Sequence, residues 1–195
     1  MKIMLIILAV LFSLVIISQT YFIMATSETQ PYQVIKKEKD FEIRLYPPAT
    51  MATVAMNAKT YKELSSSGFR KLAGFIFGGN QDNKNIAMTT PVHMDISDSI
   101  STMSFVMPAN YSRDNLPKPN DSTITIKTTA DDYVAALQFG GYANDEKIKE
   151  NTVKLKSALE ASGVEYFGNY RFLGYNAPYQ LIGRKNEIIV SIRWK

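Results

Sequence analysis

Hydrophobic and polar positions divide the chain into an apolar N-terminal segment and a longer mixed region that begins near Tyr32. The mixed region contains short stretches of alternating character; in one of them Phe41, Ile43 and Leu45 alternate with Glu42, Arg44 and Tyr46. Successive side chains of a strand point to opposite faces, so this alternation predicts half-buried strands. The predicted strands span residues 32–36, 41–46, 50–56, 86–90, 103–107, 122–128, 133–139, 170–175 and 187–194.

Two segments have the three- and four-residue spacing of amphipathic helices. The first precedes Gly78-Gly79, which ends it, and its apolar stripe consists of Tyr61, Leu64, Gly68, Leu72 and Phe75 or Ile76. The second begins at Asn144, a residue type that caps helix N-termini, and ends at Gly163, a residue type common after helix C-termini. Each half of the mixed region therefore contains one predicted helix.

Two helices among many short, amphipathic strands predict an α+β fold. Both halves show the order strand, helix, strand, strand, although the residues themselves are scarcely alike. Strands with one polar face are typical of antiparallel sheets. We therefore expect a distorted antiparallel β-barrel, built from two pseudo-repeated halves, with two flanking α-helices.

The N-terminal segment, residues 1–27, has the pattern of an export signal. Lys2 is followed by an uncharged apolar run over residues 3–17 and then by Ser18-Gln19-Thr20. A second apolar patch at 21–25 extends the run toward the length of about 20 residues that spans a membrane. The segment is expected to be a cleaved signal peptide or an uncleaved membrane anchor. The protein is accordingly expected to be exported (periplasmic or secreted) or anchored through its N-terminus.

The composition of the chain argues against several classes of function. The chain has no cysteine and one histidine, which excludes thiolate metal sites and leaves too few ligands for an ordinary zinc site. No nucleophile elbow or phosphate-binding loop is present, so hydrolytic chemistry is disfavoured. The net charge of +4 comes from scattered residues and not from a basic stripe, so nucleic acid is not an expected partner.

The chain is rich in aromatic side chains and in methionine. It contains 10 Phe, 11 Tyr, 9 Met and 1 Trp. Most of these residues are expected in the core, but some can line a pocket for a flat apolar ligand.

Several stretches together resemble the SOUL haem-binding family: "FEIRLYPP", "GFRKLAGFIFGGNQDNKNIAMTTPV", "MSFVMP", "FGGYAND" and "GRKNEIIV". The longest is the most specific, and the resemblance covers the chain from Tyr32 onward, so residues 28–195 are interpreted as a SOUL-like domain. It implies a barrel of two related halves and non-covalent binding of haem or a related tetrapyrrole, without catalytic turnover. The alternative is a module that has kept this fold but binds another hydrophobic small molecule or a protein.

The resemblance also implies an apolar groove beside the first helix, with cations near the haem propionates. In this chain the expected apolar wall is Leu64, Leu72, Phe75 and Ile76, and the available cations are Arg70, Lys71, Arg184 and Lys185.

His93 is the remaining candidate, because it is the only histidine and it follows the signature "IAMTTPV". A histidine can be an axial ligand of haem iron, or it can be a buried side chain that is satisfied by hydrogen bonds. The sequence leaves both interpretations of His93 open.

Overall fold

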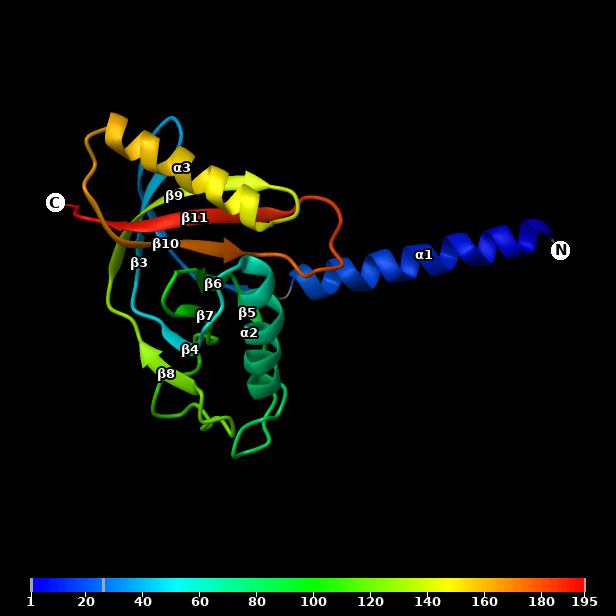
Figure 1. The fold of residues 1–195 in the computed structure, drawn as a ribbon. Helices are drawn as coiled ribbons and strands as arrows, with labels where there is room; N and C mark the ends of the chain where they lie inside the picture. The colour runs from blue at the N-terminus through cyan, green and yellow to red at the C-terminus, as the bar shows by residue number, and fades with distance from the viewer. Residues whose placement is uncertain (1, 26, 195) are drawn as a thin grey trace.

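The computed structural model describes residues 2–25 and 27–194; the side chains of residues 3, 16 and 18–25 lie outside this description. These residues form helices and strands in the order shown in Figure 1. The helices are α1 (Lys2–Ala25), α2 (Tyr61–Ile76) and α3 (Asp145–Ala161). The strands are β1 (Glu28–Thr29), β2 (Gln33–Lys37), β3 (Glu42–Tyr46), β4 (Thr50–Met56), β5 (Thr89–Thr90), β6 (Val92–Asp95), β7 (Ser101–Val106), β8 (Ile124–Thr128), β9 (Asp132–Gly140), β10 (Tyr166–Gly174) and β11 (Lys185–Ile192).

One large antiparallel sheet organises the domain and confirms the predicted α+β class. Its nine strands lie in the order β2-β3-β9-β11-β10-β6-β7-β4-β8, and β1 and β5 form a separate parallel pair. Within the described residues β2 and β8 are sheet edges, because neither pairs with a further strand on its outer side. The sheet is therefore open, and the predicted barrel of two pseudo-repeated halves is not confirmed.

The helices α2 and α3 pack on different parts of this sheet. Figure 1 shows α3 along β9, β10 and β11, and α2 contacts β4 and β7. Between the helices and the sheet lies a core that includes Leu64, Leu72, Met103, Leu155 and Ile188, all fully buried. The apolar stripe of α2 seen in the sequence is thus the face that packs on the sheet.

Both helices begin at a capping residue, Thr60 for α2 and, as the sequence predicts, Asn144 for α3. The side-chain oxygen of Thr60 accepts a hydrogen bond from the Glu63 N–H, and that of Asn144 accepts one from the Lys147 N–H. These bonds satisfy backbone donors that have no partner inside the helix. On the buried face of α2, a Cβ atom at Gly68 would lie 3.2 Å from the Met103 Cβ atom. The missing side chain therefore lets α2 approach β7 closely.

The segment around Pro91 differs from its prediction. The sequence predicts a strand over 86–90, but only Thr89–Thr90 is a strand, β5, and a second strand, β6, follows directly after Pro91. Proline cannot donate to a sheet ladder, and here it lies between two strands of different sheets. The strand β6 pairs with both β7 and β10, so it lies near the middle of the large sheet.

The helix α1 extends away from the sheet domain in Figure 1. The large apolar side chains described between Met4 and Ile17 are exposed. In the described part of the chain, no helix meets the combined length and apolar character needed to cross a membrane. The alternatives of a signal peptide and an anchor stay predictions.

Candidate functional site

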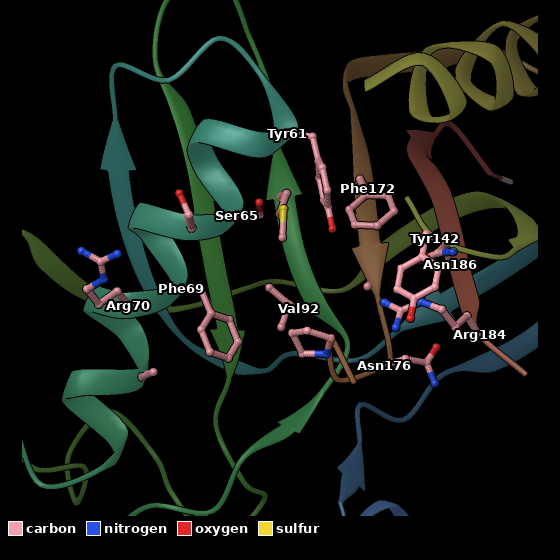
Figure 2. A pocket seen from close by; sticks show the side chains of 15 residues that line it. Tyr61, Ser65, Phe69, Arg70, Val92, Tyr142, Phe172, Asn176, Arg184 and Asn186 are labelled. Atoms are coloured by element: carbon pink, nitrogen blue, oxygen red, sulfur yellow. The ribbon is translucent and has the colours of Figure 1, made fainter. Parts of the chain in front are cut away.

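A cavity of about 690 Å³ lies between α2, the strands β6 and β10, and the loop that joins β10 to β11. Its volume falls within the range of roughly 300–1,000 Å³ that small-molecule and cofactor sites occupy. Figure 2 shows aromatic side chains on both sides of it, with Tyr61 and Phe69 on α2 and Phe172 and Tyr142 across from them. The cavity is larger than three others in the described residues, which have volumes of about 390, 350 and 220 Å³.

The helix α2 contributes a row of side chains at four-residue spacing. Tyr61, Ser65, Phe69 and Ala73 line the cavity, together with Ser66 and Arg70 beside them. Residues four apart lie on one face of a helix, so this row forms a continuous wall. It is adjacent to the core stripe, since the helix turns by about 100° per residue, and it shares only Tyr61 with that stripe.

The predicted apolar wall lies on that neighbouring core face. Leu64, Leu72, Phe75 and Ile76 are buried against the sheet, and none of the four lines the cavity. Their stripe was the strongest helical signal in the sequence because it packs the helix.

The sheet side of the cavity comes from β6 and β10, which pair with each other. Val92 and Met94 of β6 line it, as do Phe172 and Gly174 of β10, and Met94 lies opposite Phe172 in the ladder. The Tyr61 ring contacts the Phe172 ring edge-on, with 5.3 Å between ring centroids. This contact joins α2 to β10 at the helix N-terminal end of the cavity.

Two cations and no carboxylate line the cavity. Arg70 and Arg184 lie on its two sides in Figure 2, and the other lining residues are uncharged. Arg184 is held in place, because its Nη1 donates to the carbonyl oxygens of Ala177 and Gln180, both at 2.8 Å. Its guanidinium also stacks 4.3 Å from the centroid of the Tyr142 ring. The cavity therefore has an apolar interior with positive charge at its margins.

The two predicted lysines have other partners. Lys71 Nζ donates to the Thr123 hydroxyl at 2.9 Å and lies 3.4 Å from an Asp121 carboxylate oxygen. Lys185 Nζ lies 3.1 Å from a Glu187 carboxylate oxygen and 4.1 Å from the centroid of the Tyr175 ring. Of the four predicted cations, the structure brings only Arg70 and Arg184 to the cavity wall.

His93 lies between Val92 and Met94 on β6, but its side chain is not part of the cavity wall. Alternate side chains of a strand point to opposite faces, so His93 faces the other side of the sheet. There its Nε2 is 2.7 Å from Gln30 Oε1, and the residue is 6% exposed. Burial, together with the positive charge of Arg171, lowers the pKa of His93 to about 3. The structure thus places His93 as a buried, neutral, hydrogen-bonded side chain away from the cavity.

That opposite side of the sheet also holds a buried charge pair. Glu187, which is fully buried, accepts hydrogen bonds from Arg44 Nη1 at 2.9 Å and from the Tyr175 hydroxyl at 2.7 Å. Burial alone would raise the pKa of the Glu187 carboxyl, but the hydrogen bond and charge of Arg44 hold that pKa below its usual value. Both members of the pair are therefore ionised.

The groups on the cavity wall that can ligate iron are the Met94 thioether and the phenols of Tyr61 and Tyr142. Burial raises the pKa of Tyr61, which opposes the phenolate form that a metal would need. In the described residues no three His, Cys, Asp or Glu side chains gather into a metal site. The donor set suits a ligand held by apolar contact and by charge more than one held by strong coordination.

Tyr61, Phe69, Met94, Phe172 and Tyr142 are site residues that the sequence did not single out. The four-residue row on α2 is visible in the sequence, although its serines give it the character of a surface face. The other members come together only through the pairing of β6 with β10, far apart in the chain.

An open antiparallel sheet with an apolar, cation-flanked cavity under one helix has the geometry of a small-molecule-binding domain. Comparison with protein families is consistent with this class: the sequence model of the SOUL heme-binding protein family matches residues 27–191. The chain therefore belongs to the SOUL heme-binding protein family.

Curated relatives cover most of the chain. Heme-binding protein 2 of Homo sapiens is 30% identical over 156 residues, which cover 76% of this chain and 76% of that protein. Heme-binding protein 2 of Mus musculus is 29% identical over 81% of this chain and 80% of its own length. Heme-binding protein 1 of Sus scrofa is 30% identical over 83% of this chain and 90% of its own length.

Solved structures extend the likeness in fold. The C-terminal domain of EcmrR superposes with a TM-score of 0.61 at 8% identity, covering 83% of this chain and 98% of that one. A hydrolase from Listeria innocua gives a TM-score of 0.57 at 8% identity, covering 82% and 94%. At these identities the likeness concerns the fold alone.

Proposed function

We propose that this protein binds haem or a related tetrapyrrole non-covalently in the cavity beside α2. The observation that carries the proposal is an apolar cavity of about 690 Å³ whose only charged lining residues, within the described chain, are two arginines. Haem is flat and apolar, with two carboxylates at one edge, so it needs this combination of surfaces. The curated relatives, which are named for heme binding, support the same ligand.

The lining residues offer a ligand two kinds of contact, apolar and charged. Phe69, Phe172 and Met94 offer apolar contact to the faces of a macrocycle, and burial of such surface drives binding. Arg184, already oriented by two carbonyl oxygens, offers a charged donor to a carboxylate. Arg70 offers a second cation on the other side, so an anionic edge finds a partner in either orientation. We propose no catalytic turnover of the bound ligand.

The test is an absorbance titration of the full chain with haem, comparing two substitutions on the same helix. Ala73→Trp fills the cavity, because Ala73 lines it, whereas Ser67→Trp adds the same ring to an exposed position outside it. We expect saturable binding with a shifted Soret band in the wild type and in Ser67→Trp, and at least tenfold weaker binding in Ala73→Trp. Equal affinity in all three proteins would place haem elsewhere or show it to be non-specific.

A second candidate ligand is another apolar anion, because the cavity wall offers no histidine to recognise iron. Titration with the metal-free porphyrin tests this difference directly. Similar affinity for haem and porphyrin indicates recognition of the macrocycle and its carboxylates. Strong preference for haem indicates coordination, and Met94→Leu, which keeps the volume, would then shift the Soret band. If the protein binds neither haem nor porphyrin, the alternative is favoured, namely a module that has kept this fold but binds another hydrophobic small molecule or a protein.

We also propose that residues 1–27 direct the domain to or across a membrane, as a signal peptide or an anchor. The charged Lys2 followed by exposed apolar side chains supports this proposal. Mass measurement of the protein recovered from an expressing cell distinguishes the two forms. Loss of the segment indicates a cleaved signal, and an intact chain in the membrane fraction indicates an anchor. An intact chain in the soluble fraction contradicts both.

A further inference from the structure

The loop between β10 and β11 carries the most exposed large apolar side chains of the sheet domain. Leu181 is 75% exposed and Ile182 is 86% exposed, and the Tyr179 ring lies exposed two residues earlier. In the described structure these aliphatic side chains belong to neither of the two core clusters. Single exposed apolar residues are ordinary on protein surfaces, whereas two adjacent ones at a loop tip call for an explanation.

Hydrogen bonds within this loop connect the residues at its base. Asn176 Nδ2 donates to Gln180 Oε1 at 2.6 Å, and Asn176 Oδ1 accepts from the Lys185 N–H at 2.6 Å. Arg184 Nη1 donates to the carbonyls of Ala177 and Gln180. Polar groups thus bond inward and hold the loop, and the apolar tip is left outside. This arrangement suits a tip that enters an apolar phase.

The charges around the tip favour a negatively charged surface. Residues 175–186 contain two cations, Arg184 bonded to two carbonyl oxygens and Lys185 paired with Glu187, and no acidic residue. In Figure 1 this loop and the C-terminal end of α1 lie on the same side of the sheet domain, and residues 3–27 likewise contain no acidic residue. An acid-free region with exposed apolar and aromatic side chains and nearby cations has the character of elements that lie in the interface of anionic membranes.

We propose that the β10–β11 loop docks on an anionic lipid surface, with Leu181 and Ile182 entering the boundary between headgroups and acyl chains. A protein partner is a weaker interpretation, because a stable protein interface buries about 800 Å² per partner and two side chains at a narrow tip offer much less. Asn176, Pro178 and Arg184 of the same loop line the cavity, so docking brings the cavity wall to the lipid surface.

The chain's lack of cysteine makes a site-specific test direct. Leu181→Cys in the full chain is labelled with an environment-sensitive fluorophore, and Val153→Cys, an exposed position on α3, serves as the matched control. Phosphatidylcholine vesicles with and without phosphatidylserine are then added. We expect a blue shift and quenching by a lipid-borne quencher for the label at 181, stronger with phosphatidylserine, and neither effect for the label at 153.

Each other outcome overturns the proposal in a recognisable way. If α1 alone attaches the protein to vesicles, both labels stay in water although the protein is bound. A blue shift at 181 that grows with protein concentration in the absence of vesicles indicates docking on a second copy. Failure of the protein to bind either kind of vesicle removes the lipid surface as the partner.

A second readout links docking to ligand loading, and this part rests on the proposed function. The double substitution Leu181→Asp with Ile182→Asp leaves the cavity wall unchanged, so haem affinity in vesicle-free solution is expected to stay at the wild-type value. Transfer of haem from phosphatidylserine-containing vesicles is expected to slow by at least about tenfold, because the two apolar side chains together contribute more than that factor to partition. Loss of solution affinity points to a failure of the proposed function or of the fold; equal transfer rates point to a failure of docking alone.

Discussion

The two faces of the sheet around β6 differ: one borders an open apolar cavity, and the other buries paired polar side chains. On one face Val92 and Met94 border a cavity with an apolar interior and arginines at its margins. On the other face His93 is buried against Gln30, and nearby in the sheet Glu187 is bonded to Arg44 and Tyr175. His93 and Glu187 on that second face are paired within the protein, so they contribute to a defined fold. The first face leaves its space and two cations, Arg70 and Arg184, available to a ligand.

Removal of Glu187 should have the largest effect on stability. Glu187→Ala removes the buried partner of the Arg44 guanidinium and leaves it only the half-buried Glu42, and breaking a buried pair costs about 3–5 kcal/mol. Urea denaturation measures this loss. Replacement of both charges, Arg44→Met with Glu187→Leu, is the control and should restore much of the stability. A loss below about 1 kcal/mol in the single variant would show that water reaches the pair.

The pH dependence of stability should isolate His93. Its folded-state pKa of about 3 is far below the unfolded value of 6.5, so the unfolded chain binds the proton more tightly. The contribution of His93 to the free energy of unfolding is therefore fully present above about pH 6.5. It is lost as the pH is lowered from that value toward the folded-state pKa. The expected loss between pH 8 and pH 5 is about 2 kcal/mol, because unfolding takes up one proton only below about pH 6.5, roughly 1.5 pH units of that interval at about 1.36 kcal/mol each.

The single histidine makes this experiment clean, because no other side chain has an ordinary pKa in that window. His93→Gln should remove most of the slope in urea denaturation series between pH 8 and pH 5. The same variant should bind haem with wild-type affinity and an unchanged Soret band, since His93 faces away from the cavity. A Soret band that moves in this variant would instead make His93 an axial ligand.

The fold was largely predictable from the sequence because its signals are local. Alternation located β4 at residues 50–56, and the Leu64-to-Ile76 stripe and the Asn144 cap located the helices. The strand β6 was missed, since it is four residues long and directly follows Pro91. Whether the sheet closes depends on which strands are its edges, and no local pattern encodes that choice.

The site was less predictable because it depends on pairing between distant segments. Met94 and Phe172 lie opposite each other only after β6 and β10 pair. On α2 the strongest apolar signal, through Leu64 and Leu72, marks the packing face, whereas the cavity face mixes Tyr61 and Phe69 with serines. Apolar periodicity identifies what a helix buries in its own core, and a binding face that must stay partly open gives a weaker pattern.

Arg70 and Lys71 offer the smallest and most specific test of the difference between an available cation and a paired one. They are neighbours on α2 with the same charge, but Arg70 lines the cavity and Lys71 is bonded to Thr123 and Asp121. Exposed charge pairs contribute roughly 0.2–1 kcal/mol, so Arg70→Ala should weaken haem binding by about two- to fivefold in the absorbance titration. Lys71→Ala lowers the net charge equally and should leave the affinity unchanged. Equal losses in both variants would mean that the overall charge of the domain, and not the cavity margin, attracts the ligand.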